Sequence, residues 1–261
     1  MTRRLMIVML ALTTIVACGK SKANLPAAGS VDADKYLFDH GTDALKRKHW
    51  IEGREYFRKL VDTYPQSPFR QDAKLGIGDS YLGENSIESN ILAVNEFKEF
   101  LSFFPGNART DYAQYKVALA YAQQMLGSDR DPTPAQDALA ATDLFARNFP
   151  TSQYADEVQK VRRQALDNIS GHDYKVGLFY YRRRWYPGAI ERFKALLEKD
   201  PEFPQRDAIF FYLGEMYHLS KQDAQALPYF DRVVKEFAKS DFLERAQKGI
   251  DEIDQAGTVK R

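Results

Sequence analysis

The chain has 261 residues, of which 44% are hydrophobic and 28% are charged, a composition typical of a folded protein rather than a disordered one. Its 37 basic and 36 acidic residues nearly cancel. A protein that binds nucleic acid would carry a concentrated basic surplus, so this balance argues against that class.

The first 17 residues have the layout of a secretory signal peptide. Arg3 and Arg4 precede an apolar run from Leu5 to Ala17, which ends in small residues. The run is shorter than the roughly 20 residues that a helix needs to cross a bilayer. We therefore interpret residues 1–17 as a signal peptide and not as a membrane span.

The single cysteine of the chain, Cys18, follows this run directly. The segment from Ile15 to Cys18 resembles the bacterial lipobox, in which an aliphatic residue lies three positions before a cysteine and a small residue lies directly before it. In such proteins the cysteine sulfur is lipidated and begins the mature chain. The alternative is an ordinary signal peptide, cleaved at an A-x-A-like site, with an incidental cysteine.

The lipobox interpretation predicts an anchor and an address. Several acyl chains on Cys18 hold a protein durably at a membrane. The next residue is Gly19, not the aspartate that often retains such proteins at the inner membrane, so we expect the periplasmic face of the outer membrane. Residues 18–33 are small and polar and include a proline, which predicts a flexible tether before the folded part at 34–256.

Two short patterns recur in this folded part. In the first, a phenylalanine lies four residues after a small residue and eight before a proline, as at Phe57, Phe97 and Phe193. In the second, a small residue precedes an aromatic residue by three positions, as at Gly78, Ala118, Gly177 and Gly214. Patterns that repeat every few tens of residues are typical of solenoid proteins.

The last copy, at residues 207–240, is the fullest. It matches the tetratricopeptide repeat (TPR) pattern W-x₂-L-G-x₂-Y…A-x₃-F, with phenylalanine for the first tryptophan, at Phe210, Leu213, Gly214, Tyr217, Ala226 and Phe230. Two antiparallel helices cross closely only where a side chain is tiny. We therefore expect Gly214 to face Ala226, with Tyr217 and Phe230 in the gaps beside them.

These patterns predict an all-α fold, a right-handed α-solenoid of five TPR-like helix pairs at residues 34–67, 71–107, 111–152, 170–203 and 207–240. Units one and three are degenerate, with Ala44 in place of the tyrosine and Thr142 in place of the phenylalanine. Apolar spacing predicts an extra helix at 154–169, running into unit four with a bend near Gly171, and a capping helix at 242–253. The alternative is a generic helical bundle.

The sequence contains no recognisable catalytic constellation, so we expect a binding protein without cofactor or metal. No two of the four histidines have metal-ligand spacing, and no Gly-rich phosphate loop or activated serine is present. Asp129 and Asp131, in an insertion at 127–136, suggest a cation site. Carboxylates before a Pro-Thr-Pro segment more often cap the next helix.

Two surfaces are candidates for binding. The first helices of TPR units line a concave groove, into which we expect Phe38, Leu45, Tyr112 and Tyr115 to point and hold an extended or helical peptide. The same side chains serve packing between repeats in the alternative interpretation. The second candidate is YYRRRWY at 180–186, which includes Arg184 and Trp185, residue types enriched at interface hot spots. Its arginines also suit a helix C-terminus.

The lipobox, the tether and the five units together resemble the BamD family, TPR lipoproteins of the outer-membrane β-barrel assembly machinery. The segments DRDP, FPTSQYADE (149–157) and YY-x-x-R (180–184) occur in the order found in that family. The resemblance implies a non-enzymatic subunit that binds the POTRA domains of a barrel protein through its C-terminal units. Arg192 matches a family arginine that pairs with an acid there, if one residue is deleted in the preceding turn.

The resemblance also implies that the N-terminal units receive unfolded barrel-protein clients, which suits the groove residues, and that other assembly lipoproteins join the complex. A TPR lipoprotein scaffold for pilus or cell-wall machinery is the alternative, since a lipobox and repeats alone would look the same. The DRDP insertion and the extra helix at 154–169 favour the assembly role.

Overall fold

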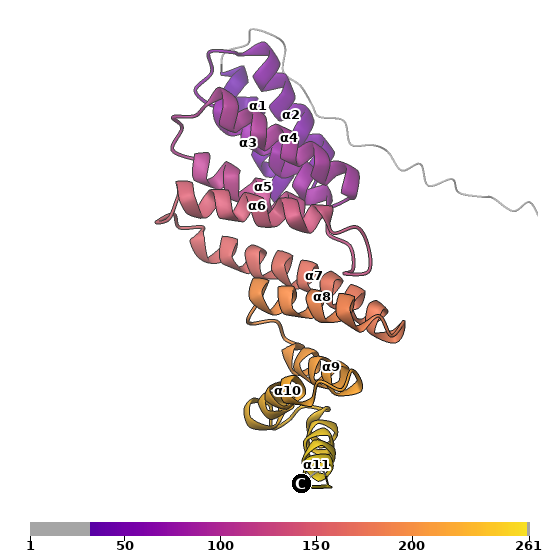
Figure 1. The fold of residues 1–261 in the computed structure, drawn as a ribbon. Coiled ribbons are helices and arrows are strands. Elements are labelled where there is room, and N and C mark those ends of the chain that lie inside the picture. The colour runs from indigo at the N-terminus through magenta and orange to yellow at the C-terminus, as the bar shows by residue number, and fades with distance from the viewer. Residues whose placement is uncertain (1–31, 260–261) are drawn as a thin grey trace, which may run out of the picture.

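The computed structural model describes residues 32–259, and Figure 1 shows their arrangement. The signal peptide and Cys18 lie outside the described residues. Eleven helices account for most of this part of the chain, which contains no strand. The helices are α1 (Ala33–Lys46), α2 (Trp50–Thr63), α3 (Arg70–Glu84), α4 (Ile87–Phe103), α5 (Thr110–Ala122), α6 (Thr133–Asn148), α7 (Ala155–Arg182), α8 (Tyr186–Lys199), α9 (Arg206–Leu219), α10 (Asp223–Glu236) and α11 (Leu243–Val259).

Helices that are adjacent in the chain pack against each other, as expected for stacked TPR-like hairpins, and α11 follows at the end of the stack. We keep the five unit names for the pairs from α1–α2 to α9–α10. The expected extra helix is present as the first half of α7, which is a single helix of 28 residues and supplies the first helix of unit four with its second half. Helix α1 begins at Ala33, so this residue belongs to the helix and not to the tether.

The stack has an inner and an outer side. First helices of neighbouring units approach each other, as α1 approaches α3, α5 approaches α7, α7 approaches α9 and α9 approaches α11. Among the described residues, no two second helices of neighbouring units come as close. The first helices therefore line the inner side, and the second helices α2, α4, α6, α8 and α10 form the outer side.

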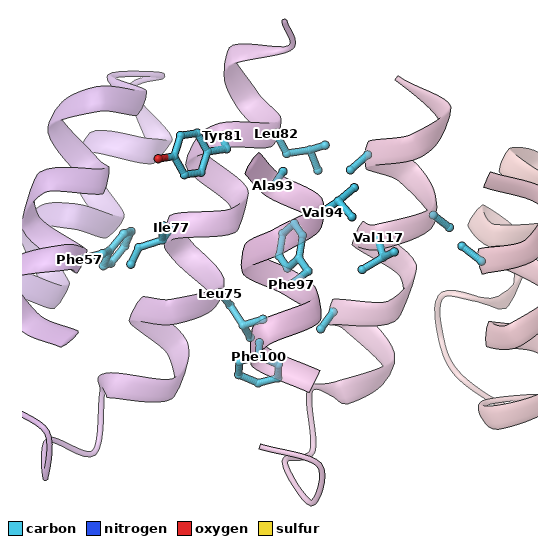
Figure 2. Close-up of a cluster of buried hydrophobic side chains, with 14 of the residues drawn as sticks. Phe57, Leu75, Ile77, Tyr81, Leu82, Ala93, Val94, Phe97, Phe100 and Val117 are labelled. Carbon is cyan, nitrogen blue, oxygen red and sulfur yellow. The ribbon is translucent and has the colours of Figure 1, made fainter. Parts of the chain in front are cut away.

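A phenylalanine of the second helix holds each of four units together by filling the space beside a glycine. Phe57 of α2 is one of the buried side chains in Figure 2. Its ring lies against Gly41 of its own unit and Gly76 of the next. A Cβ atom at Gly41 would lie 2.7 Å from that ring, so even alanine would collide. Equivalent contacts join Phe97 to Gly78, Phe193 to Gly177, and Phe230 to Gly214 and Gly249.

In unit five, the ring of Phe230 lies beside Gly214 as the repeat pattern predicts, and its Cδ1 atom would lie 2.6 Å from a Cβ atom there. The glycine thus makes room for an aromatic ring, which also reaches Gly249 on α11. A fully buried phenylalanine contributes about 1.5–3 kcal/mol by leaving water, so this contact is a principal link between unit five and the cap.

The turns between units also repeat. An aromatic residue directly follows each of the second helices α2, α4, α6 and α10. Three residues after it comes a serine or asparagine, whose side chain accepts a hydrogen bond from the backbone N–H of the residue two positions further along the chain. The turn after α8 differs, since Asp200 takes the aromatic position and Phe203 takes the serine position. Both residues are buried.

Asp200 is stabilised by the extension of α7. The Arg163 guanidinium donates to both carboxylate oxygens, at 2.9 and 2.5 Å, and the Ser170 hydroxyl donates at 2.8 Å. Burial opposes ionisation of Asp200, but the hydrogen bonds from Arg163 and Ser170 outweigh it and lower the pKa of this carboxyl. Helix α7 is therefore attached to the α8–α9 turn by an ion pair between the partly exposed Arg163 and the buried Asp200.

Candidate functional site

Phe38 and Leu45 lie on α1, on the inner side of unit one. Both are half-buried and pack against the N-terminal core. The Phe38 ring stacks on Phe69 with centroids 5.0 Å apart, which joins unit one to unit two. Leu45 fills the space beside Gly53 of α2. Each side chain therefore has a packing role and leaves only part of its surface to the groove.

Tyr112 and Tyr115 lie on α5, two units further along the same inner side. The Tyr112 hydroxyl lies 2.8 Å from both carboxylate oxygens of Asp79, to which it can donate. The Tyr115 ring stacks on Tyr154 at 5.3 Å, and Tyr112 meets the same ring edge-on at 5.5 Å. Burial first, and then the negative charge of Asp79, raise the pKa of Tyr112, so it remains a neutral donor.

These four residues form two separate aromatic sites and not one pocket. Helix α3 lies between α1 and α5 in the stack, and its Asp79 is bonded to the second site. An extended peptide that follows the inner side would meet the unit-one site and the unit-three site in succession. The structure thus brings Tyr112 and Tyr115 together but leaves Phe38 and Leu45 apart from them.

Arg184 and Trp185 form the turn between α7 and α8. Arg184 is in the left-handed backbone region, with φ of 59°. Trp185 directly precedes α8, and 55% of its surface is exposed. The indole meets the Tyr180 ring edge-on at 4.7 Å and covers Gly188, where a Cβ atom would lie 2.8 Å from it. The Trp185 side chain is therefore held by two contacts on one side while the other side faces solvent.

Arg192 lies elsewhere, on the outer side of α8. It is exposed, and its side chain makes no ion pair or hydrogen bond with any described residue. Seven residues of helix place it about 10 Å along the axis from Trp185. Arg192, Arg184 and Trp185 are all predicted to bind a partner, and the structure places Arg192 on an outer helix face and the other two in a turn.

The residue set that sequence reasoning missed is Arg163, Ser170 and Asp200. A signal was present, because Asp200 interrupts the row of aromatic residues that follow the other second helices. The partner of Asp200 could not be identified from the sequence, since Arg163 lies 37 residues earlier, on the extension of α7.

In the insertion between α5 and α6, Asp131 is bonded to Thr133, the first residue of α6. Asp131 accepts from the backbone N–H of Thr133 at 3.0 Å and from its hydroxyl at 2.7 Å, at the start of α6. Asp129 pairs with Lys175 at 3.5 Å. In residues 32–259, no three histidine, cysteine, aspartate or glutamate side chains gather in a way that suits a metal ion. Nor does any described helix have the length and apolar character of a membrane span.

The sequence matches the model of one known protein family. The sequence model of the family described as "YfiO: Outer membrane lipoprotein" matches residues 31–227, which is more than half of the protein. The chain belongs to this family. The YfiO match covers units one to four and α9, and it ends inside α10. It thus includes every proposed site residue of the solenoid.

Curated relatives of this YfiO family member are described as outer membrane protein assembly factor BamD. The Caulobacter vibrioides relative is 29% identical over 182 residues, covering 69% of this chain and 58% of its own. The Xylella fastidiosa (Temecula1) relative is 25% identical, covering 72% and 67%, and the Vibrio cholerae relative is 23% identical, covering 74% and 82%. The similarity to BamD that the sequence motifs indicate is confirmed, although the chain spans only 58% of the length of the Caulobacter protein.

Two solved structures are also similar to this YfiO family member. The MamA protein is 16% identical with a TM-score of 0.35, covering 80% of this chain and 93% of its own. A tetratricopeptide repeat protein from Parabacteroides merdae is 14% identical with a TM-score of 0.37, covering 85% and 92%.

Proposed function

We propose that this chain is a lipid-anchored subunit of the β-barrel assembly complex at the periplasmic face of the outer membrane. The match to the YfiO outer membrane lipoproteins, together with relatives named as assembly factors, carries the proposal. The lipobox supports attachment through Cys18. The role is binding and positioning, without catalysis or cofactor.

The outer side of α8 binds the core barrel subunit. Arg192 is exposed there, and it has no ionic partner among the described residues, so an acid of the POTRA region can pair with it. A charge-assisted pair with an arginine is stronger than a neutral hydrogen bond and more specific in direction. The neighbouring exposed residues of α8 are also largely charged, which suits a polar interface.

The inner side receives unfolded barrel proteins. Phe38 and Leu45 on α1, and Tyr112 and Tyr115 on α5, each expose part of an apolar surface toward the groove. An extended segment with alternating aromatic side chains is suited to two such sites placed one after the other. Because these side chains also pack between helices, they offer a rigid surface that loses little entropy on binding.

The first test is purification of the full-length lipidated protein from detergent-solubilised envelopes, with mass spectrometry of its partners. We expect a stoichiometric barrel protein that carries POTRA domains. Pilus or cell-wall components without such a barrel protein would contradict the proposal and favour a scaffold in those machines.

The second test is Arg192→Glu. We expect at least a tenfold loss of the barrel protein from the purified complex, because repulsion replaces a charge-assisted pair. The melting temperature should not change, since Arg192 contacts no part of the core. Lys239→Glu is the matched control, because Lys239 is an exposed cation without an ion pair in the turn after α10. Equal recovery of the barrel protein from both variants would place the interface elsewhere.

The client groove is tested by a photo-crosslinking residue at position 115, which keeps an aromatic ring. We expect cross-links to unfolded barrel proteins from position 115 and none from position 136, where Gln136 is exposed on the outer side of α6. Cross-links of equal yield from both positions would refute a specific inner groove.

A further inference from the structure

Exposed apolar side chains gather along one edge of the solenoid. Each unit is a hairpin, so the turns between its first and second helices all lie on the same edge; Figure 1 shows the α5–α6 loop and the α7–α8 turn on one side. Each of these five turns has a large apolar residue at or beside it that is about half exposed, namely Ile51, Ile87, Leu126, Trp185 and Leu219. We call this row the hairpin edge.

Unpaired cations accompany the apolar residues on the hairpin edge. Lys48, Arg184 and Lys221 occupy equivalent positions in three of the turns, with φ of 60°, 59° and 60°. Arg182 and Arg183 extend the positive charge of the α7–α8 turn. All five are exposed, and none forms an ion pair with any described residue.

The acids on the same edge are largely engaged within the protein. Asp129 pairs with Lys175, Glu84 pairs with Arg54 at 2.6 Å, and Asp223 lies 2.7 Å from the His218 ring. Asp131 accepts from Thr133. Glu88 and Asp137 keep exposed carboxylates without an ion pair among the described residues. The free positive charge of the hairpin edge is therefore concentrated at the α7–α8 turn, where Arg182, Arg183 and Arg184 follow one another.

The opposite edge, where one unit passes to the next, lacks this combination. Its turns contain prolines at 65, 105, 150 and 201, and Phe103 is the large apolar residue that it exposes most, at 69%. Lys74, which lines a pocket with Phe103, pairs with Glu96 and Glu99. Arg147 and Lys239 are exposed cations without an ion pair at this edge, and they lie in different turns. The two edges of one solenoid thus differ in how their free cations are grouped, since three follow one another at the α7–α8 turn.

From this contrast we infer that the hairpin edge rests on an anionic phospholipid surface, with Trp185 and its arginines as the main contact. Single apolar tips in a row suit a flat surface, whereas a protein hot spot is a compact patch. Tryptophan prefers the interface of a bilayer, and each arginine or lysine near an anionic surface raises binding about fivefold. This inference rests on the proposed anchor at Cys18.

The anchor permits this orientation. The chain from Cys18 to Ala33 can span at most about 50 Å, whereas α1 is about 21 Å long from the tether to the first hairpin turn. A lipid on Cys18 can therefore lie in the same membrane plane as the hairpin edge. The edge would add contacts to an anchored protein, where its effective concentration at the membrane is already high.

The test measures which edge meets the bilayer in full-length lipidated protein reconstituted into vesicles. Trp50→Phe leaves Trp185 as the single tryptophan, and its fluorescence is read with brominated acyl chains as the quencher. The control reporter is Phe103→Trp, on the opposite edge, in a background with Trp50→Phe and Trp185→Phe. In phosphatidylethanolamine vesicles that contain phosphatidylglycerol, we expect quenching of Trp185 and none of the control reporter.

Charge is tested by Arg182→Gln, Arg183→Gln and Arg184→Gln together. We expect quenching of Trp185 to fall to the level of the control, since three charges account for about a 100-fold factor in binding. Omission of phosphatidylglycerol, or high salt, should act in the same direction. If Trp50→Phe lowers the melting temperature, a bimane at Leu219→Cys is compared with one at Ala108→Cys, because Cys18 is the only native thiol.

The outcomes separate the two proposals. A protein that does not float with the vesicles refutes the anchor and this inference together. Flotation with equal quenching of both reporters, or quenching that ignores charge, keeps the anchor and overturns the orientation. Shielding of Trp185 only when outer-membrane proteins are added would assign the turn to a protein partner and also overturn the inference.

Discussion

Units three and four are neighbours with the same topology, yet they are held together by different residues. Unit three has Ala118 and Thr142 where unit four has Gly177 and Phe193. In unit four the ring of Phe193 lies directly against Gly177. In unit three both positions are fully buried, and the Thr142 hydroxyl donates to the Leu139 carbonyl at 2.7 Å.

The turns that follow these two units are also held by different residues. After α6, Phe149 packs on Phe145 at 5.6 Å, and the Ser152 hydroxyl donates to Asp111 at 2.6 Å. After α8, Asp200 is buried at the position that corresponds to Phe149, and Phe203 is buried at the position that corresponds to Ser152. A buried carboxylate is tolerated only with a partner, so the exchange depends on Arg163.

The comparison shows that the extension of α7 and the unusual turn belong together. The extra residues of α7 carry Arg163 to Asp200, while Phe203 is free to pack near Tyr174, at 5.8 Å. A solenoid tolerates a change at one junction because each unit contacts mainly its neighbours. Four predictions test this account, beginning with the largest effect.

Arg163→Ala should lower the free energy of unfolding by about 1.5–3 kcal/mol, because it removes the charge-assisted hydrogen bonds from the buried carboxylate of Asp200, while the partial exposure of Arg163 screens the pair. Urea unfolding measures this change. Arg162→Ala is the matched control, since Arg162 pairs with Asp143 at the surface and should cost under about 1 kcal/mol. Similar losses for both variants would mean that the pair with Asp200 is not what attaches α7 to the turn.

Gly177→Ala should destabilise the protein by about 1–3 kcal/mol, because the new Cβ atom would collide with the Phe193 ring. The double variant Gly177→Ala with Phe193→Thr copies the residue types of unit three, and it should relieve the collision. Thermal melts of both variants check this. A Gly177→Ala protein as stable as the parent would contradict the contact between glycine and ring.

Ser152→Ala should cost about 1 kcal/mol, since it removes one hydrogen bond to Asp111 and the acceptor for the Tyr154 backbone N–H. Ser240→Ala, in the equivalent turn after α10, should cost a similar amount, because its hydroxyl donates to Asp207 at 2.6 Å. Chemical unfolding of the two variants tests whether the ordinary turns are equivalent. Unequal losses of stability in the two variants would show that these turns are not equivalent.

The pH dependence should show the smallest effect. The pKa of Asp200 is lower in the folded protein than the ordinary value of about 3.9, so its contribution is present above about pH 4 and is lost as the pH falls through the folded pKa. Asp200→Asn should therefore reduce the acid sensitivity of stability below about pH 4. An unchanged acid profile, followed by circular dichroism, would show that Asp200 is not ionised in the native state.

Much of the fold could be predicted from local spacing. The Gly-x₂-Tyr pattern marks the first helix of a pair, and the Ala-x₃-Phe pattern marks the second. The two patterns together predict helix pairs because their residues meet where two helices that are close in sequence cross. The second contact of each ring could not be predicted in this way: Phe57 also meets Gly76, and Phe230 also meets Gly249, both on the helix that follows. Arg192 could be selected only through a family resemblance, since an exposed arginine has no signature of its own.

The sequence by itself determined the all-helical repeat, since its pattern depends on residues a few positions apart, and it predicts the lipobox for the same reason. Tertiary structure decided the rest: the pairing of Arg163 with Asp200, and the contacts of Phe57 with Gly76 and of Phe230 with Gly249. Those features join residues from different units, and their free energies depend on burial and distance. Neither quantity exists until the helices have stacked.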